Sequence, residues 1–343
     1  MSYLIEEELH ENTSVISSLD PKQIEAISAA MIKAIKNGNK VIFFGNGGSA
    51  SDAVHIAAEF SGRYLMERPA MDGIALSSLS SITGIGNDYG YDRIFIRQLE
   101  ACMKEGDVAV GLSTSGNSKN VVLALEFAKA NGGITVSFTG SGGAIKDIVD
   151  YPLIIQSTHT PRIQEAYLCA GHIICGLVEK GVFGHKAVFI DRDNTIAPDV
   201  PYCSNPDDFN LYPYVAESLK KLNDAGYISI LVTNQSGIGR GYFTEDTLKS
   251  IHDKMNSELS KQGAFFDSIY FCPHTPEDKC SCRKPNTGMY MKAVREHHIN
   301  LRESWVIGDS DADMDAGKKL GCRTIRIEDG NTFEDAVNTI LND

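Results

Sequence analysis

Two stretches of the sequence carry residue types that handle phosphate groups, and their designs are unrelated. The first half has the glycine-rich run Gly45–Ala50 and the hydroxyl-rich run Ser113–Ser118. Loops of this kind hold a phosphate through N–H and O–H groups without attacking it. The second half has Asp191-Arg192-Asp193 directly after the apolar run 187–190, and an aspartate at a strand end can attack phosphorus. One chain with both patterns predicts an enzyme with two activities on phosphorylated metabolites.

Both runs in the first half lie between an expected strand and an expected helix. The glycine-rich run separates a strand at 41–44 from a helix at 49–60, and the hydroxyl-rich run follows a strand at 108–112. Free N–H groups and the dipole at a helix N-terminus attract anions. Serine-rich turns are also common helix caps, but two loops at equivalent positions favour binding. Four hydroxyls are expected to surround one phosphate: those of Ser113, Thr114, Ser115 and Ser118.

Two pairs of polar residues each share one face of an expected helix. His55 and Glu59 are four residues apart, and Gln164 and His172 are eight apart in a helix that begins at Pro161. A single pair of this kind is more often a surface or core contact than a site. The spacing therefore predicts no chemistry by itself.

These features belong to a half of the chain, residues 1 to about 180, that resembles a sugar isomerase (SIS) domain and, more narrowly, the sedoheptulose-7-phosphate isomerases. The segments that carry the resemblance are GNGGSASDAVHIAAEFSGR at 45–63, ERP at 67–69, GIGNDYGYD at 84–92, STSGNS at 113–118 and TPRIQEAYLCAGH at 160–172. The resemblance implies a zinc ion held by His55, Glu59, Gln164 and His172. It implies further substrate contacts from Asn46, Gly47, Ser49, Asp88 and Gln164.

Ketose–aldose isomerisation fits these residue types. The reaction moves a proton between C1 and C2 through an enediol, so it needs a base and an acid along the sugar backbone. Glu59 is the expected base and His172 the expected acid, and the two roles can be exchanged. A zinc ion would polarise the carbonyl oxygen.

The second half carries four polar motifs, each at the end of an expected strand. Asp191 is the expected nucleophile that forms an aspartyl-phosphate. Asp193 is expected to protonate the leaving alcohol and then activate water. With these two, Asp309 is expected to bind magnesium. A single aspartate at a strand end is commonly a helix cap, but four motifs in order disfavour that reading. Phosphoryl or substrate contacts are expected from Thr233, Asn234, Arg283 and Lys284.

A cluster of soft metal ligands lies just before Arg283. Three cysteines and one histidine fall within eleven residues: Cys272, His274, Cys280 and Cys282. Three thiolates and one imidazole complete a tetrahedral zinc site and leave no open position, so we expect structural zinc. The other cysteines, in apolar patterns, are expected to be buried free thiols: Cys102, Cys169, Cys175, Cys203 and Cys322.

Residues 186 to about 340 resemble the haloacid dehalogenase (HAD) superfamily of phosphatases, and more narrowly the D-glycero-D-manno-heptose 1,7-bisphosphate phosphatases and the related histidinol-phosphate phosphatases. The resemblance rests on DRDNTI at 191–196, LVTNQSGIGRGYF at 231–243, CPHTPEDKCSCRKP at 272–285 and IGDSDADMDAG at 307–317. Asn194 stands where many relatives have glycine, and Ser310 where heptose phosphatases often carry lysine. Both departures lie near the phosphate and leave the preferred anomer open.

Composition limits the partners and the compartment. A net charge of −13 disfavours a nucleic-acid surface. Met1–Leu9 is acidic and does not resemble a signal peptide. No uninterrupted apolar run approaches the roughly 20 residues of a membrane span. We therefore expect a cytoplasmic protein with no membrane or nucleic-acid partner.

The alternation of strands and helices predicts an α/β protein with two domains, each a mainly parallel sheet flanked by helices. The expected domains are an SIS phosphosugar isomerase domain at 1–182 and a HAD-like, Rossmannoid phosphatase domain at 186–343. The glycine-containing segment 180–186 is the expected boundary.

The two resemblances together predict a bifunctional enzyme of heptose biosynthesis that acts on phosphorylated seven-carbon sugars. The first resemblance implies a homotetramer formed through the SIS domain. A separate kinase is a possible partner, because no G-x-x-x-x-G-K-[ST] loop occurs in the chain. Two alternatives stay open: a histidinol-phosphate phosphatase, and a phosphatase regulated by a phosphosugar-sensing SIS domain.

Overall fold

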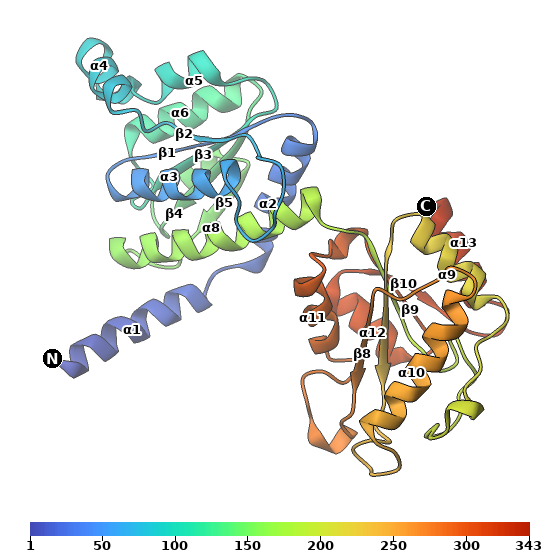
Figure 1. The fold of residues 1–343 in the computed structure, drawn as a ribbon. Helices are drawn as coiled ribbons and strands as arrows, with labels where there is room; N and C mark the ends of the chain where they lie inside the picture. The colour runs from blue at the N-terminus through green and yellow to red at the C-terminus, as the bar shows by residue number, and fades with distance from the viewer. The chain divides into compact units, whose positions relative to one another are not determined.

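The chain forms two compact units, Met1–Phe183 and Gly184–Asp343. The computed structural model describes all residues from 1 to 343. Each unit contains a parallel sheet of five strands with helices along its faces (Figure 1). The expected α/β class with two parallel-sheet domains is confirmed. Helix α8 (Thr160–Phe183) runs past its expected end near Val178, so the helix takes in part of the segment expected as the boundary.

The sheet of the first unit has the strand order β2-β1-β3-β4-β5. Its strands are β1 (Val41–Gly45), β2 (Gly73–Ala75), β3 (Val108–Ser113), β4 (Ile134–Thr139) and β5 (Tyr151–Ile154). Alternate side chains of β1 enter two different cores: Val41 and Phe43 face one, Ile42 and Phe44 the other. All four are fully buried, as expected for a strand covered on both faces.

Helices supply the remainder of both cores in the first unit. One core includes buried residues of α2 (Pro21–Lys36), α3 (Gly48–Ser61) and α8, and the other includes residues of α5 (Ile96–Cys102), α6 (Lys119–Ala130) and α7 (Ile145–Ile148). The remaining elements are α1 (Ser2–Ser17), α4 (Leu79–Tyr89) and the 3-10 turn η1 (Tyr91–Arg93). Helix α2 begins at Pro21, behind an Asp20 cap that accepts a bond from the Lys22 N–H.

The second unit repeats this architecture with the strand order β10-β9-β6-β7-β8. Its strands are β6 (Ala187–Ile190), β7 (Ile228–Asn234), β8 (Ser268–Cys272), β9 (Trp305–Gly308) and β10 (Arg323–Arg326). Its helices are α9 (Val215–Asp224), α10 (Glu245–Ser260), α11 (Gly288–Glu296), α12 (Asp311–Leu320) and α13 (Phe333–Asn342). The 3-10 turns are η2 (Pro206–Asp208), η3 (Pro276–Asp278) and η4 (Leu301–Glu303). Since β6 and β9 are neighbours, the residues that follow them meet at one edge of the sheet.

Helix α8 is long and apolar enough to cross a membrane by length and composition alone. Half of its 18-residue apolar stretch is buried inside the unit, and Ile163, Tyr167 and Ile174 belong to the core. The core helix of a soluble protein can have the same length and composition, and the buried face of α8 accounts for its apolar sequence.

No disulfide joins any of the eight cysteines. Cys175, Cys203 and Cys322 are buried, but Cys102 and Cys169 are only partly buried. The expectation of burial was therefore wrong for these two.

Candidate active sites

The expected phosphate loops of the first unit lie side by side, because β1 and β3 are paired neighbours. Two asparagines join the loops: Asn46 donates to Asn120 Oδ1 at 2.8 Å, and Asn120 donates back to Asn46 Oδ1 at 2.9 Å. Tyr91 adds a bond from its hydroxyl to Asn46 Oδ1 at 2.9 Å. Gly47 has φ 55° and ψ −123°, a conformation that a side chain would disfavour. These bonds fix the first loop beside the second.

Three of the four expected hydroxyls gather in the second loop. Ser113 donates to Ser118 Oγ at 3.0 Å, and its Oγ lies 3.5 Å from that of Ser115. Thr114 lies between them in sequence but does not share these bonds. Ser49 is buried in the first turn of α3, where free N–H groups favour an anion. Asp88 is exposed on α4 and bonds its neighbour Asn87, so no direct contact brings it to this group.

His55, Glu59 and His172 form a compact group of metal-binding atoms. The Nε2 atoms of the two histidines are 2.9 Å apart, and His55 Nε2 lies 3.7 Å from Glu59 Oε1. Their ligand atoms all lie within 4.8 Å of one another. Nitrogen and carboxylate oxygen are suitable zinc ligands, and three such ligands leave a position for substrate. The three residues therefore fit a catalytic zinc ion.

A buried ion pair anchors the segment that covers this group. Tyr64 stacks on the His172 ring at a centroid distance of 5.5 Å. The main-chain N–H groups of Tyr64, Leu65 and Met66 donate to the Glu179 carboxylate. Arg68 donates to the same carboxylate at 3.0 Å, and both side chains are almost completely buried. Because both charges are paired and hydrogen-bonded, the burial is tolerated.

Gln164 belongs to α8, and its side chain lies against the beginning of α3, away from the two histidines. A β-carbon built on Gly48 would lie 2.1 Å from Gln164 Nε2, so the amide lies directly against this glycine. Gly48 precedes His55 by about two turns, roughly 10 Å along the helix. Asp52 is buried beside the amide, and burial, opposed by His55 and Gln164, raises its pKa to about 6. The role of Gln164 as a zinc ligand stays a prediction.

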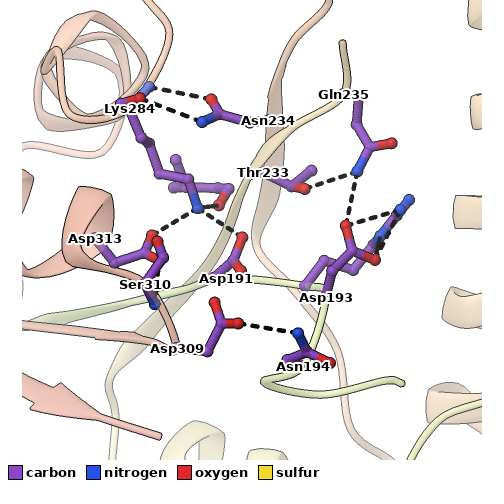
Figure 2. A network of polar contacts seen from close by, with 12 residues as sticks. Asp191, Asp193, Asn194, Thr233, Asn234, Gln235, Lys284, Asp309, Ser310 and Asp313 are labelled. Atoms are coloured by element: carbon purple, nitrogen blue, oxygen red, sulfur yellow. Dashed lines mark hydrogen bonds and ion pairs between the residues drawn. The ribbon is translucent and has the colours of Figure 1, made fainter. Parts of the chain in front are cut away.

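The second unit contains a buried ammonium group between two carboxylates. Lys284 Nζ lies 2.6 Å from Asp191 Oδ1 and 2.6 Å from Asp313 Oδ1 (Figure 2). Burial opposes the charge of Lys284, but the two carboxylates outweigh it and raise its pKa. Burial raises the pKa of Asp191 to about 7, although the Lys284 charge acts in the opposite direction. A magnesium ion at this carboxylate would further favour the anionic nucleophile.

Asn234 fixes the main chain of Lys284. Its Oδ1 accepts from the Lys284 N–H at 3.1 Å, and its Nδ2 donates to the Lys284 carbonyl at 3.3 Å. The amide thus positions the lysine, whereas Thr233 lines the same cavity as Asp191. Arg283 points elsewhere and donates to the His274 carbonyl at 3.3 Å.

Asp191, Asp309 and Asp313 each place a carboxylate oxygen within 4.8 Å of the others, a spacing that fits a metal ion. Asp193, which was expected in this set, turns its carboxylate to Arg192 and Gln235 instead. Oxygen-rich sites of this type suit magnesium, which keeps several waters and binds through few carboxylates. A cavity of about 180 Å³ lies over the group.

The two departures from the phosphatase pattern have local explanations. Asn194 has φ 55°, in the left-handed region that glycine adopts readily and asparagine more often than other residues. It also donates to Asp309 Oδ2 at 3.1 Å. Ser310 caps α12 in a capping box with Asp313, with its hydroxyl 2.6 Å from Asp313 Oδ2.

The cysteine cluster has the geometry of a tetrahedral metal site. The three sulfur atoms lie 3.3 to 3.6 Å apart, and His274 Nδ1 lies 3.3 and 3.6 Å from two of them. Ligands around one zinc ion, at about 2.3 Å for sulfur and about 2.0 Å for nitrogen, lie about 3.5 to 3.8 Å apart. The ligand set is Cys272, His274, Cys280 and Cys282. Arg283 also donates its N–H to Cys280 Sγ at 3.4 Å, which links the cluster to Lys284.

Several residues of these sites gave little or no signal in the sequence. Asn120, Tyr64 and Glu179 act through contacts across the fold, which no local spacing reveals. Asp313 had a usable signal, because it stands four residues after Asp309 at the beginning of an expected helix. Gln235 lies next to the expected Thr233 and Asn234 but is not itself at the strand end.

Comparison with known proteins matches each half separately. The SIS domain family model matches residues 6–140, and the HAD-hydrolase-like model matches residues 281–341. Phosphoheptose isomerase 2 of Campylobacter jejuni is 48% identical over 185 residues, which are 53% of this chain and 90% of that protein. Phosphoheptose isomerase of Clostridium acetobutylicum is 52% identical over 167 residues, which are 48% of this chain and 85% of that protein.

Several solved structures match the other half. One of them is a D,D-heptose 1,7-bisphosphate phosphatase from B. bronchiseptica, complexed with magnesium and phosphate. The two sequences are 34% identical, the match covers 46% of this chain and 87% of that one, and the TM-score is 0.41.

Proposed function

The chain belongs to the phosphoheptose isomerase family through its first unit, and from this we propose that it is a bifunctional enzyme of heptose biosynthesis. The first unit isomerises sedoheptulose 7-phosphate to D-glycero-D-manno-heptose 7-phosphate. The second dephosphorylates D-glycero-D-manno-heptose 1,7-bisphosphate at C7 and releases the 1-phosphate. The observation that carries the proposal is that both units have assembled reactive groups: His55, Glu59 and His172 in one, Asp191, Lys284 and Asp313 in the other.

In the isomerase, the substrate phosphate binds the loop at 113–118 and the N-terminus of α3. The sugar then extends toward Glu59 and His172, which exchange a proton between C1 and C2. A zinc ion held by His55, Glu59 and His172 would polarise the carbonyl oxygen, and Gln164, against Gly48, would contact the substrate. Tyr64 keeps the His172 ring in place by stacking on it.

In the phosphatase, the Asp191 carboxylate attacks the phosphoryl group and forms an aspartyl-phosphate. Lys284 and the Thr233 hydroxyl contact the phosphoryl oxygens, and Asp193 gives a proton to the leaving sugar oxygen. Asp193 then takes a proton from the water that releases phosphate. Magnesium at Asp191 and Asp309 supplies charge neutralisation. We propose that zinc at the cysteine cluster holds the loop before Lys284. Metal analysis of a Cys280→Ser variant tests this proposal.

A panel of substrates tests this assignment. The purified chain is offered both anomers of heptose 1,7-bisphosphate, histidinol phosphate and sedoheptulose 7-phosphate, in magnesium. We expect turnover of the bisphosphate and of the ketose phosphate. Preferred hydrolysis of histidinol phosphate would instead assign the second unit to that reaction, and a first unit that binds sedoheptulose 7-phosphate without converting it would be a sensor.

We propose that the protein is a cytoplasmic homotetramer that assembles through the first unit. Helix α1 exposes Tyr3, Leu4, Ile5 and Leu9 and buries only Val15, so its apolar side is largely uncovered within one chain. Exposed apolar surface of this kind is typical of protein interfaces. Sedimentation should show a tetramer, and a fully active isomerase monomer would contradict this.

A further inference from the structure

The carboxylate of Asp193 is held from two sides by side chains with no assigned role. Arg192 forms a bidentate contact, with Nε 2.9 Å from Oδ1 and Nη2 3.1 Å from Oδ2. Gln235 Nε2 donates to the same Oδ2 at 3.1 Å. The planar guanidinium fork of Arg192 and the third donor, from Gln235, leave the Asp193 carboxylate little rotational freedom.

Arg192 is itself immobilised in the core of the unit. Its side chain is 2% exposed, and the guanidinium lies over the Phe209 ring at 5.6 Å. His252 is buried nearby, and burial together with the Arg192 charge lowers the pKa of His252 to about 4. The histidine is therefore neutral and adds no second cation. Arg192 is therefore a buried, charged support for Asp193.

Gln235 connects Asp193 to the phosphate site. The same Nε2 that donates to Asp193 donates to Thr233 Oγ1 at 2.9 Å (Figure 2). The Thr233 hydroxyl is the acceptor in this bond, so its own hydrogen is available to a phosphoryl oxygen with or without Gln235. The side chain of Gln235 is 5% exposed, so the bridge is shielded from water.

Asp193 lies between two cavities. On one side it lines the cavity of about 180 Å³ that contains Asp191 and Lys284. On the other it lines a cavity of about 290 Å³ with Tyr202 and Phe243. The carboxyl group is thus placed between the nucleophile and a space that suits the departing sugar.

We propose that Arg192 and Gln235 are positioning residues that hold the carboxyl group of Asp193 against the leaving-group oxygen. The inference rests on the proposed phosphatase function. As the bond between Asp191 and phosphorus forms and the phosphorus–oxygen bond of the ester breaks, the Asp193 proton moves to the departing sugar oxygen. Removal of either support therefore impairs proton donation and leaves the attack by Asp191 intact.

The dependence of kcat/KM on the leaving group distinguishes a positioning role from general damage to the fold. Arg192→Met and Gln235→Leu are compared with the wild type on heptose 1,7-bisphosphate and on p-nitrophenyl phosphate. Because kcat/KM reports only the steps up to the aspartyl-phosphate, it isolates the first transfer. We expect kcat/KM on the sugar phosphate to fall about 100-fold, since general acids contribute about 10²–10⁴-fold. On p-nitrophenyl phosphate it should fall less than about threefold, because that phenolate leaves without a proton.

Two further variants sharpen the comparison. Arg192→Lys keeps the charge but not the fork, and should restore only part of the sugar-phosphate activity. In an Asp193→Asn background, Arg192→Met should cause no additional loss on the sugar phosphate, since the group that it positions is absent. Arg295→Met, on the exposed side of α11, is the matched control. It should leave kcat/KM unchanged on both substrates.

Equal losses on the two substrates, or full additivity with Asp193→Asn, would overturn the inference, because Arg192 and Gln235 would then support the fold and not the acid. Thermal unfolding curves of the variants identify misfolding, and Gln235→Leu carries the test if Arg192→Met does not fold. A wild-type chain that hydrolyses neither substrate would instead remove the proposed phosphatase function.

Discussion

Phosphate release should disappear in Asp191→Asn, with a loss of about 10⁴-fold or more. An amide cannot attack phosphorus, and removal of a catalytic nucleophile costs losses of this size or larger in enzymes that form covalent intermediates. The substitution keeps the side-chain shape beside Lys284, with which Asp191 is paired at 2.6 Å. Release of inorganic phosphate from heptose 1,7-bisphosphate is the measurement, and chelation of magnesium should give a similar loss in the wild type.

The first unit of the same preparation is the control for this variant. Asp191 lies in the unit Gly184–Asp343, whereas the isomerase residues lie in Met1–Phe183. Isomerisation by Asp191→Asn should therefore equal that of the wild type. Persistent phosphate release in Asp191→Asn would mean that another residue is the nucleophile.

Isomerisation should be abolished by Glu59→Gln and by His172→Gln. Each substitution removes a proton-transfer group, which contributes about 10²–10⁴-fold to such reactions. Each also removes one of three clustered metal ligands, so zinc bound to the first unit should decrease. Conversion of sedoheptulose 7-phosphate, followed together with metal content, measures both effects.

A substitution at a nearby surface carboxylate is the control for these two variants. Glu67→Gln changes an exposed carboxylate whose only partner is the exposed Arg63, and should leave isomerisation unchanged. Phosphatase activity should remain normal in all three variants. Turnover like that of the wild type in both Glu59→Gln and His172→Gln would remove the assignment of the acid and the base.

Element types and order were predictable because both units are regular α/β folds. Buried parallel strands are short apolar runs, and the run 187–190 coincides with β6. Helix ends were less certain: α8 continues to Phe183 because Val178 and Gly181 are still buried, while the sequence signal for its end was weak.

The sites were predictable where chemistry and a strand end coincide. Asp191 and Asp309 follow neighbouring strands, so parallel topology alone brings them together. The supporting contacts depend on side-chain direction, which local sequence does not specify. Arg68 with Glu179, and Gln235 with Asp193, illustrate this: the members of each pair lie far apart in sequence and on different elements.

The two proposed reactions of this chain are not consecutive steps. The isomerase product carries a single phosphate, whereas the phosphatase substrate carries two, so a kinase must act between the two sites. The decisive measurement is incubation of the purified chain with sedoheptulose 7-phosphate, magnesium and ATP, with and without a heptose-7-phosphate kinase. We predict heptose 7-phosphate alone in the first mixture and heptose 1-phosphate in the second. Heptose 1-phosphate without the kinase, or none with it, would contradict the account.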